Sequence, residues 1–427
     1  MQKEIAFIIY YHKDNKYSFN ALIGALETDE IIDKIEIYYI KDKDILINNV
    51  KNLLLNYKNV IIGISFFTTQ LWDVYGLIKI LKKEYQSKTI LIAGGPHPTG
   101  DPLGTLRMGF DIAFIGEGEE TLIEFFHKIK NNENFRKING IAYLDDKQEL
   151  IYTEKRNPIE LDKYPPFPIM NNKFGPIEIT RGCPFFCYFC QTPYILGSKP
   201  RHRSIDSICK YVKIMKEKNL TDIRFISPNA FSYGSVDGKR LNIPNLETLL
   251  FKIKEIIAPD GRLFLGSFPS EVRPEHVNEV TLDLIVKYAS NDNIIIGAQS
   301  GSPNILELCH REHTVEDIYK AVELTLSKNI KANVDFIFGL PDETEEDIEL
   351  TIKMIKYLSK KGARIHTHSF IPLPKTPFAK KEAARLNNKL KDLITELTSK
   401  SIAFGDWRKQ ENLGRKIGYY LKTGRLE

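Results

Sequence analysis

The sequence predicts an α/β protein in which a doubly wound parallel sheet precedes a partial (β/α)6 barrel. Three observations lead to this fold class. Short β-branched runs alternate with longer amphipathic segments, a proline-rich stretch interrupts the alternation once, and the alternation then resumes. Near-continuous apolar strands between helices are typical of parallel sheets that are covered on both faces. A chain of 427 residues, 42% of them hydrophobic, is long enough for two or three domains.

The first domain is expected over residues 1–135. Its five predicted strands are 4–11, 34–40, 59–67, 89–97 and 111–118. Helices are predicted between strands, for example at 44–57 and 71–85. Doubly wound sheets bind ligands in the crevice at the carboxyl ends of their strands, and glycines there let a ligand approach the backbone closely. No G-x-G-x-x-G motif follows the first strand, so a nicotinamide-binding domain is not indicated.

Three further segments are expected after the first domain. Residues 136–173 are predicted to hold a hairpin (138–157) and a linker with four prolines in "NPIELDKYPPFPIM". Residues 174–380 are predicted to form the barrel, and 381–427 a basic, partly helical tail. The six predicted barrel strands are 176–180, 222–228, 262–269, 293–302, 331–341 and 363–373.

Three of the five cysteines fall in "CPFFCYFC", directly after the first barrel strand, where active sites of such barrels lie. Thiolates at the C-x3-C-x2-C spacing of Cys183, Cys187 and Cys190 can hold one compact metal centre. A structural zinc usually takes four ligands, whereas three thiolates leave one iron of a four-iron cluster without a protein ligand. The alternatives are a zinc site that borrows a distant histidine and a chance group of buried thiols.

The C-x3-C-x2-C motif, with the aromatic Phe189 before its third cysteine, resembles the signature of the radical S-adenosylmethionine (radical SAM) superfamily. The resemblance runs through most of residues 174–378. It implies that the three thiolates hold a [4Fe–4S] cluster and that SAM chelates the fourth iron. It also implies a one-electron donor such as ferredoxin or flavodoxin, since reduction cleaves SAM to methionine and a 5′-deoxyadenosyl radical. That radical removes a hydrogen atom from the substrate, while the protein orients the reactants and excludes water.

Other segments resemble the SAM-binding strands of this superfamily. In 297–314, Arg311 would pair with the methionine carboxylate, a task that suits a guanidinium group. The segment 334–344 would pass beside the adenine of SAM. The segment 267–275 contains two lesser candidates for a contact with SAM, Ser270 and Arg273. The second barrel strand of the superfamily usually ends in a Gly-Gly-Glu-like run that holds the amino group of SAM. Here the strand ends in "FISPNAF", and Ser227 and Asn229 are the candidates to replace that contact. The residues expected to contact SAM are Phe189, Ser227, Asn229, Ser270, Gln299, Ser300, Arg311, Ile337 and Gly339.

A flavodoxin- or Rossmann-like domain before such a barrel resembles the cobalamin-binding, class B-like radical SAM proteins, most of which are methyltransferases. The loops "AGGPHPTGD" and "FIGEGEETL" carry this resemblance. The D-x-H-x-x-G motif is absent, which implies cobalamin without a lower histidine ligand and makes His97 a neighbour of the corrin or its nucleotide tail. The residues expected near cobalamin are Ser65, Thr68, Gly94, Gly95, His97, Gly116, Glu117 and Gly118.

The resulting hypothesis is a cobalamin-dependent methyltransferase that acts on an unactivated carbon of a small molecule or biosynthetic intermediate. One alternative is a radical SAM enzyme whose N-terminal domain is empty. Another is a transfer-RNA methylthiotransferase; those enzymes hold a second cluster on three N-terminal cysteines, and no cysteine precedes Cys183. A third, from another class, is a non-catalytic iron–sulfur sensor or electron carrier, which would not need the SAM-like segments.

The remaining features are consistent with an oxygen-sensitive cytoplasmic enzyme. No apolar run has membrane-spanning length, the N-terminus does not resemble a signal peptide, and clustered thiols suit a reducing compartment. The net charge of +5, without a long like-charged block, neither requires nor excludes a nucleic-acid partner. The hypothesis of a small-molecule substrate does not include one. Cys209 and Cys309 are predicted core residues. His366 and His368 share one face of the last predicted strand, where they point into the barrel mouth, pack in the core or lie at the surface.

Overall fold

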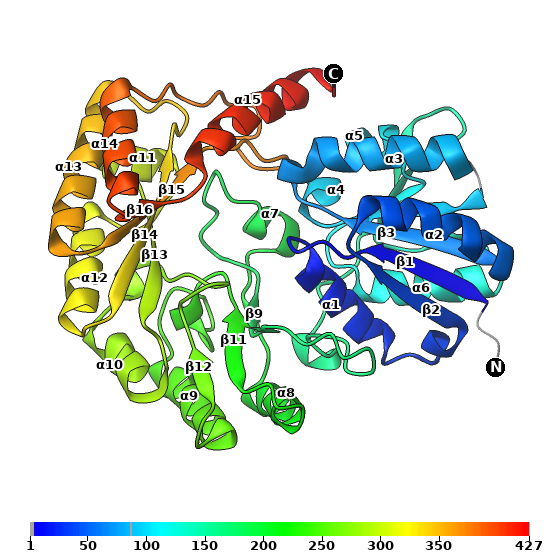
Figure 1. The fold of residues 1–427 in the computed structure, drawn as a ribbon, viewed down its shortest axis with the longest axis horizontal. Helices are drawn as coiled ribbons and strands as arrows, with labels where there is room; N and C mark the ends of the chain where they lie inside the picture. The colour runs from blue at the N-terminus through cyan, green and yellow to red at the C-terminus, as the bar shows by residue number, and fades with distance from the viewer. Residues whose placement is uncertain (1–3, 86–87, 427) are drawn as a thin grey trace. The chain divides into compact units, whose positions relative to one another are not determined.

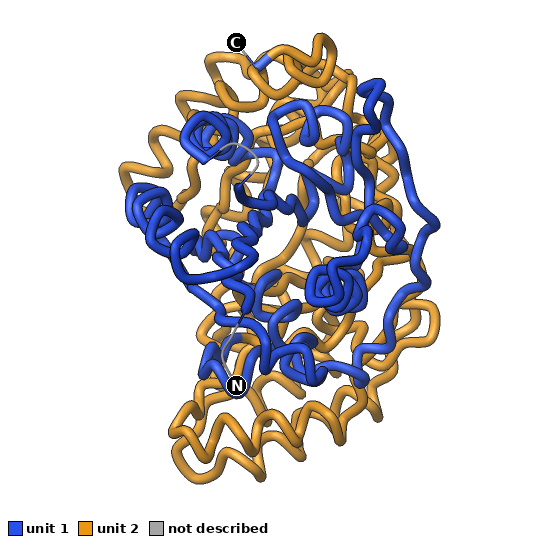
Figure 2. Tube along the Cα trace, turned by 90° about the vertical axis from the view of Figure 1, so that its right-hand side faces the viewer, with its two compact units in different colours: residues 1–175, 426–427 blue, residues 176–425 orange. Residues whose placement is uncertain are grey.

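The computed structural model describes residues 4–85 and 88–426. The chain divides into two compact units: unit 1 comprises residues 1–175 with 426–427, and unit 2 comprises residues 176–425 (Figure 2). Among the described residues, no helix combines the length and the apolar character needed to cross a membrane.

Unit 1 is built on a seven-stranded sheet with helices on both faces (Figure 1). Its strands are β1 (Ile5–Tyr10), β2 (Ile35–Ile40), β3 (Asn59–Ser65), β4 (Ile90–Gly94), β5 (Ile112–Phe114), β6 (Ile141–Leu144) and β7 (Leu150–Tyr152). Its α-helices are α1 (Lys16–Leu26), α2 (Lys43–Asn56), α3 (Leu71–Tyr85), α4 (Pro96–Gly100), α5 (Pro102–Arg107) and α6 (Glu119–Lys130).

The strand order confirms the predicted doubly wound fold. The first five strands run parallel in the order β2-β1-β3-β4-β5, and every residue of β1 is buried. Helices α1 and α6 cover one face of the sheet and α2 and α3 the other (Figure 1), which explains why the strands are apolar on both sides. The order in which strands are added to the sheet reverses between β1 and β3, because β2 lies on one side of β1 and β3 to β5 lie on the other. Sheets of this order bind ligands at this point, at the carboxyl ends of the strands.

The hairpin predicted within 136–173 belongs to the sheet of unit 1 and is not a separate linker. β6 pairs antiparallel with β5, and β7 pairs antiparallel with β6. The proline-rich segment also packs onto the unit, because Leu161 and Tyr164 are buried in a cluster with Ala25 of α1. The pairing covers what would otherwise be an exposed edge of β5, a long-range effect that local sequence patterns do not reveal.

Unit 2 carries the predicted barrel. Its strands are β8 (Ile177–Glu178), β9 (Thr180–Arg181), β10 (Arg201–His202), β11 (Asp222–Ile226), β12 (Arg262–Phe264), β13 (Asn293–Gln299), β14 (Lys331–Phe338), β15 (Arg364–Ser369) and β16 (Ala403–Phe404). Its α-helices are α7 (Thr192–Leu196), α8 (Ile205–Glu217), α9 (Ile243–Ile257), α10 (Glu279–Tyr288), α11 (Pro303–Leu308), α12 (Val315–Ser327), α13 (Glu345–Lys361), α14 (Asn388–Ser399) and α15 (Trp407–Thr423).

The barrel strands are parallel and follow one another in sequence order. β8, β11 and β12 form one part, β13 to β16 form the other, and a bridge between Val272 and Ile296 links the two parts. The sequence predicts six of these strands. β16, within the segment expected to be a tail, adds another strand beside β15, so residues 381–425 are part of unit 2.

Helix starts in unit 2 follow local chemistry. Most of its longer helices begin at a residue whose side chain accepts a hydrogen bond from a backbone N–H group of the first turn. This N–H group has no partner within the helix, so the side chain satisfies it. These capping residues are Ser204, Asn242, Asn278, Thr314, Thr344 and Asn387. The helices are thereby set to begin just after the loops at the carboxyl ends of the strands, where the candidate site lies.

Candidate active site

The three clustered cysteines lie in the loop between β9 and α7. Backbone hydrogen bonds shape this loop: the N–H of Cys183 donates to the carbonyl of Gly197 at 3.1 Å, and that of Cys190 donates to the carbonyl of Cys187 at 3.0 Å. Gly182 precedes the loop with a φ of 90°, and a Cβ atom there would lie 2.5 Å from the carbonyl oxygen of Lys199. Glycine is therefore required to place Cys183.

The thiols are largely shielded from solvent. Cys187 is buried, and Cys183 and Cys190 are half-buried. Burial raises the pKa of the Cys183 thiol to about 12 and raises that of Cys190 as well. The thiols of Cys183 and Cys190 therefore carry protons, which the binding of a metal centre would release. Three soft sulfur ligands in one short loop suit an iron–sulfur cluster.

Two buried guanidinium groups face Cys187. Arg311 Nη1 lies 3.5 Å from Cys187 Sγ, and its Nη2 donates to the carbonyl of Gly297 at 2.6 Å. Arg273 Nη1 lies 4.0 Å from the same sulfur, and its Nε donates to Glu275. Arg311 Nε and Arg273 Nη2 are buried without a hydrogen-bond partner among the described residues. Buried cations with spare donors fit an anionic cluster and a carboxylate ligand such as that of SAM.

A cavity of about 350 Å³ opens beside the cysteine loop. Ser270 Oγ donates to the carbonyl of Phe225 at 2.6 Å and accepts from the N–H of Ser227 at 3.1 Å, so it ties the end of β11 to the segment after β12. The structure brings a large part of the predicted site together around this cavity. The predicted residues that line it are Cys183, Cys187, Phe189, Cys190, Ser227, Ser270 and Arg311.

The other residues predicted to contact SAM lie outside the lining of this cavity. Asn229 is buried, and its amide group contacts His276 Nδ1 at 2.6 Å and accepts from the N–H of Arg273 at 3.3 Å. Ser300 is buried too, with its Oγ 3.3 Å from Thr351 Oγ1. Both side chains stabilise the loops at the carboxyl ends of the strands.

The remaining predicted SAM contacts lie at the ends of β13 and β14. Gln299 ends β13 with a φ of 71°, at a register shift of the ladder. Ile337 packs with Phe189 against one apolar cluster. Gly339 has a φ of 72°, and its N–H donates to Glu343 at 3.0 Å. Their contact with SAM stays a prediction.

In unit 1 the predicted cobalamin residues fall in the loops after β3, β4 and β5. Ser65 and Gly94 are register partners at the ends of β3 and β4. Gly95 has a φ of 95°, and a Cβ atom there would lie 2.7 Å from Ser65 Oγ, so glycine lets the two loops touch. A Cβ atom on Gly94, by contrast, would meet no atom within 4 Å. Gly94 therefore leaves open space at the end of β4.

Thr68 and His97 hold these loops together. Both side chains are fully buried, and His97 Nδ1 lies 3.0 Å from Thr68 Oγ1. The His97 ring also packs against Phe66, with 5.2 Å between ring centroids. Burial lowers the pKa of His97 to about 4, so the imidazole is neutral near pH 7. With no exposed surface, the two side chains support the crevice and do not offer a ligand atom to it.

The loop after β5 is also tied to its surroundings. The N–H of Gly116 donates to Thr99 Oγ1 at 3.1 Å, and Glu117 accepts from the N–H of Ile159 at 3.0 Å. A Cβ atom on Gly118 would lie 2.9 Å from Leu22 Cδ2. Gly118 therefore lies against the side chain of Leu22 on α1, at the start of α6.

Two protein families match the two units. The radical SAM superfamily matches residues 177–355, which include the cysteine loop and Arg311, and the B12 binding domain matches residues 33–126, which include the loops after β3, β4 and β5. The protein is a radical SAM enzyme with a B12-binding domain. These domains confirm the predicted cofactors of this radical SAM enzyme, namely a [4Fe–4S] cluster, SAM and cobalamin.

Curated relatives of this radical SAM enzyme include two kinds of protein. The uncharacterized methyltransferase PH0819 of Pyrococcus horikoshii is 26% identical over 331 residues, which are 74% of this chain and 68% of that protein. A tRNA-2-methylthio-N(6)-dimethylallyladenosine synthase of Finegoldia magna is 30% identical over 290 residues, which are 66% of this chain. The match spans only 57% of that synthase.

Solved structures share the fold of the radical SAM enzyme. The methyltransferase TsrM from Kitasatospora setae, with cobalamin and a [4Fe–4S] cluster bound, has a TM-score of 0.70 at 15% identity, and the match covers 88% of this chain and 74% of TsrM. The cobalamin-dependent enzyme OxsB, with aqua-cobalamin and SAM bound, has a TM-score of 0.64 at 19% identity. That match covers 83% of this chain and 52% of OxsB.

The cavity of the radical SAM enzyme also contains two acidic residues that the sequence reasoning did not single out, Glu271 and Asp335. Burial, followed by repulsion from Asp335, raises the pKa of Glu271 to about 7. A signal for Asp335 was present in "ANVDFIF", because a carboxylate on the face opposite the buried Val334 and Phe336 needs a polar surrounding. His366 and His368 line the same cavity, which agrees with the alternative in which they point into the barrel mouth.

Proposed function

We propose that this protein is a cobalamin-dependent methyltransferase that transfers a methyl group to an unactivated carbon of a small molecule or biosynthetic intermediate. One observation carries the proposal: the cysteine loop and Arg311 share a cavity with polar side chains, in a chain that also has a B12-binding domain. When bound, the cluster and SAM supply a hydrogen-abstracting radical, and cobalamin carries the methyl group. The named methyltransferases among the relatives and solved structures support this function.

The residues of the cavity have distinct roles in the proposal. Cys183, Cys187 and Cys190 hold the cluster through their thiolates. Arg311 binds the carboxylate of SAM with its unpartnered Nε and neighbouring amino group. Arg273, whose guanidinium stacks 3.5 Å from the ring centroid of Phe185, offsets the negative charge of the cluster. The aromatic rings of this loop exclude water from the radical chemistry.

The remaining cofactor contacts are proposed from the resemblance and from position. Ser227 and Ser270 face the cavity and would bind SAM directly, whereas Asn229, Gln299, Ser300, Ile337 and Gly339 would shape the strand ends around it. In unit 1, Ser65, Gly94, Gly95, Gly116 and Glu117 would lie nearest to cobalamin. Thr68, His97 and Gly118 would support that surface from beneath.

The proposal includes a cellular setting. Reduction of the cluster requires a one-electron donor, for which a small ferredoxin or flavodoxin is the expected partner. The enzyme would work in the cytoplasm, where thiols and iron–sulfur clusters remain reduced.

The proposal is tested by reconstituting the protein with iron and sulfide without oxygen, adding hydroxocobalamin and desalting. Cobalamin retained near one per chain, beside the absorption of the cluster, is the expected result. With SAM and a reductant, the reconstituted protein should form 5′-deoxyadenosine, and Cys187→Ala should abolish this product and the cluster. Cys209→Ala is the matched control, because Cys209 is a buried cysteine on α8 outside the site.

Two results would contradict the proposal. Formation of 5′-deoxyadenosine by Cys187→Ala would show that the loop does not hold the catalytic cluster. A cluster without any retained cobalamin would make unit 1 a scaffold and leave a radical SAM enzyme of another kind. Methylthiolation of transfer RNA is disfavoured, because no cysteine precedes Cys183 to hold a second cluster.

A further inference from the structure

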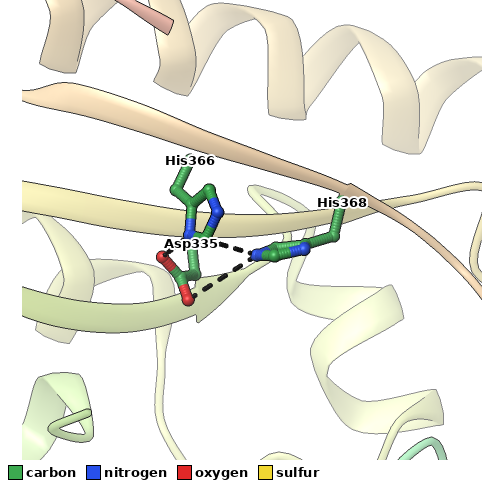
Figure 3. A group of neighbouring side chains, drawn as sticks. All are labelled: Asp335, His366 and His368. Carbon is green, nitrogen blue, oxygen red and sulfur yellow. Dashed lines mark hydrogen bonds and ion pairs between the residues drawn. The ribbon is translucent and has the colours of Figure 1, made fainter. Parts of the chain in front are cut away.

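The cavity of unit 2 contains three side chains that the proposed function does not use. Asp335 on β14 and His366 on β15 are partners in the parallel register, and His368 lies two residues further along the same face. Figure 3 shows the carboxylate and the two imidazole rings pointing toward one another. One possible ligand atom from each side chain lies within 4.8 Å of the others.

The distances in this group resemble those between ligands of one ion. His366 Nδ1 lies 2.9 Å from Asp335 Oδ1 and 3.2 Å from His368 Nε2, and His368 Nε2 lies 3.8 Å from Asp335 Oδ2. An ion with metal–ligand distances of about 2.0–2.2 Å in tetrahedral or octahedral geometry places its ligand atoms roughly 3 to 3.5 Å apart. The three side chains thus leave a position at which one ion could touch all of them.

Hydrogen bonds alone do not account for these contacts. His366 Nδ1 carries either one hydrogen or one lone pair in the plane of its ring, so it makes one good hydrogen bond. It nevertheless faces both Asp335 Oδ1 and His368 Nε2 at close range. A cation shared by three lone pairs accounts for all the contacts at once.

The two rings are held in place from the side of β16 and α15. The ring of His366 stacks on Phe404, with 4.5 Å between centroids and 9° between planes. Gln410 accepts from the N–H of Ser369 at 2.9 Å, and its Nε2 lies 3.4 Å from His368 Nδ1. The stacking holds the plane of the His366 ring, and the contact with Gln410 keeps Nδ1 of His368 turned away from the group and its Nε2 toward it. The arrangement is therefore organised before any ligand binds.

We propose that Asp335, His366 and His368 bind a divalent transition-metal ion, for which Zn²⁺ is the probe. Two imidazoles and one carboxylate form a ligand set used for Zn²⁺ and Fe²⁺, and they leave coordination positions open. An open position in the cavity would accept an oxygen or nitrogen atom of the substrate. That use rests on the proposed function, whereas the binding of the ion does not.

The test uses the untagged protein with its cluster loaded, so that iron occupies the thiols of the cysteine loop. The protein is incubated with Zn²⁺ alone, desalted and analysed for zinc and iron, and its affinity is measured by competition with a zinc-binding dye. The wild type should retain about one zinc per chain, and His366→Ala with His368→Ala should weaken binding more than the ~10–100-fold typical for loss of an outer-shell partner. His127→Gln is the matched control: it removes an imidazole on α6 that lies 2.8 Å from Asp29, and it should bind zinc as the wild type does.

Equal zinc binding by the wild type and the double variant would overturn the proposal, as would a wild type that retains no zinc. If the double variant loses its iron as well, the nearly isosteric Asp335→Asn decides: weaker zinc binding with normal iron supports the site, and unchanged binding rejects it. The zinc and iron measurements do not depend on methyl transfer. The test of the zinc site therefore remains valid even if the methyltransferase proposal fails.

Discussion

The side chain of Glu343 is half-buried and accepts a backbone hydrogen bond. It lies between β14 and α13, accepts from the N–H of Gly339 at 3.0 Å, and has a pKa that burial raises from 4.5 to about 8. The folded protein therefore holds a proton there between pH 4.5 and 8 that the unfolded chain has lost. The stability that depends on this proton is fully present below pH 4.5 and is lost as pH rises through about 8.

Glu343→Gln should remove this pH dependence, because the amide keeps an acceptor for Gly339 and has no proton to lose. We expect the Tm of the variant minus that of the wild type to rise between pH 6 and pH 9, since each unit of pKa difference corresponds to about 1.4 kcal/mol. The melting curves are recorded without oxygen on cluster-loaded protein. Parallel Tm profiles for the two proteins would show that Glu343 is ionised throughout this range.

Site residues were predictable where a reactive residue type occurs at a characteristic spacing. Residues that join the site only because two strands pair were missed. The cysteines and Arg311 belong to recognisable segments, and they meet at one cavity. The sequence carries a signal for Asp335 as a polar residue on an apolar strand, but its pairing with His366 depends on how β14 and β15 align. Thr68 and His97 were expected beside a ligand, but their burial arises from contacts between two loops.

The cysteine loop depends on one glycine more than on another. Gly182 and Gly197 have nearly the same φ, 90° and 89°, but only Gly182 has backbone atoms close to the position of a Cβ atom. Gly182→Ala should shift the backbone of Cys183 and lower the iron content per chain below half of the wild-type value. Gly197→Ala carries a similar backbone strain of ~1–3 kcal/mol and should keep its iron. Iron analysis after identical reconstitution measures both, and equal iron in the two variants would contradict this role of Gly182.

Strands within a predicted apolar run were found, even where the structure keeps only two or three residues of the run, as in β8 and β5. β16, in the segment expected to be a tail, was not predicted. The five strands of the doubly wound sheet and six barrel strands are present because each is an apolar run bounded by turns. β16 has two residues, too few to show a period, and exists through its pairing with β15. The hairpin of β6 and β7 was visible locally, but its attachment to β5 is a long-range contact.

At the scale of the whole molecule, the residues predicted for the two cofactors fall in different units. The thiols, guanidinium groups and cavity belong to unit 2, and the loops that match the B12-binding domain belong to unit 1. Each unit also has its own hydrophobic cluster. Loss of one cofactor should therefore leave binding of the other intact.

Gly94→Leu tests this division from the side of unit 1. Because a Cβ atom there meets no atom within 4 Å, the larger side chain should fill the open space at the end of β4 without disturbing the fold. We expect less than about a tenth of the wild-type cobalamin to be retained, with normal iron and normal 5′-deoxyadenosine formation, whereas Cys187→Ala should lose iron and keep cobalamin. Gly76→Leu, also in open space but on α3, is the control. Wild-type cobalamin retention by Gly94→Leu would place the cofactor elsewhere, and joint loss of both cofactors in either variant would show that the two sites depend on each other.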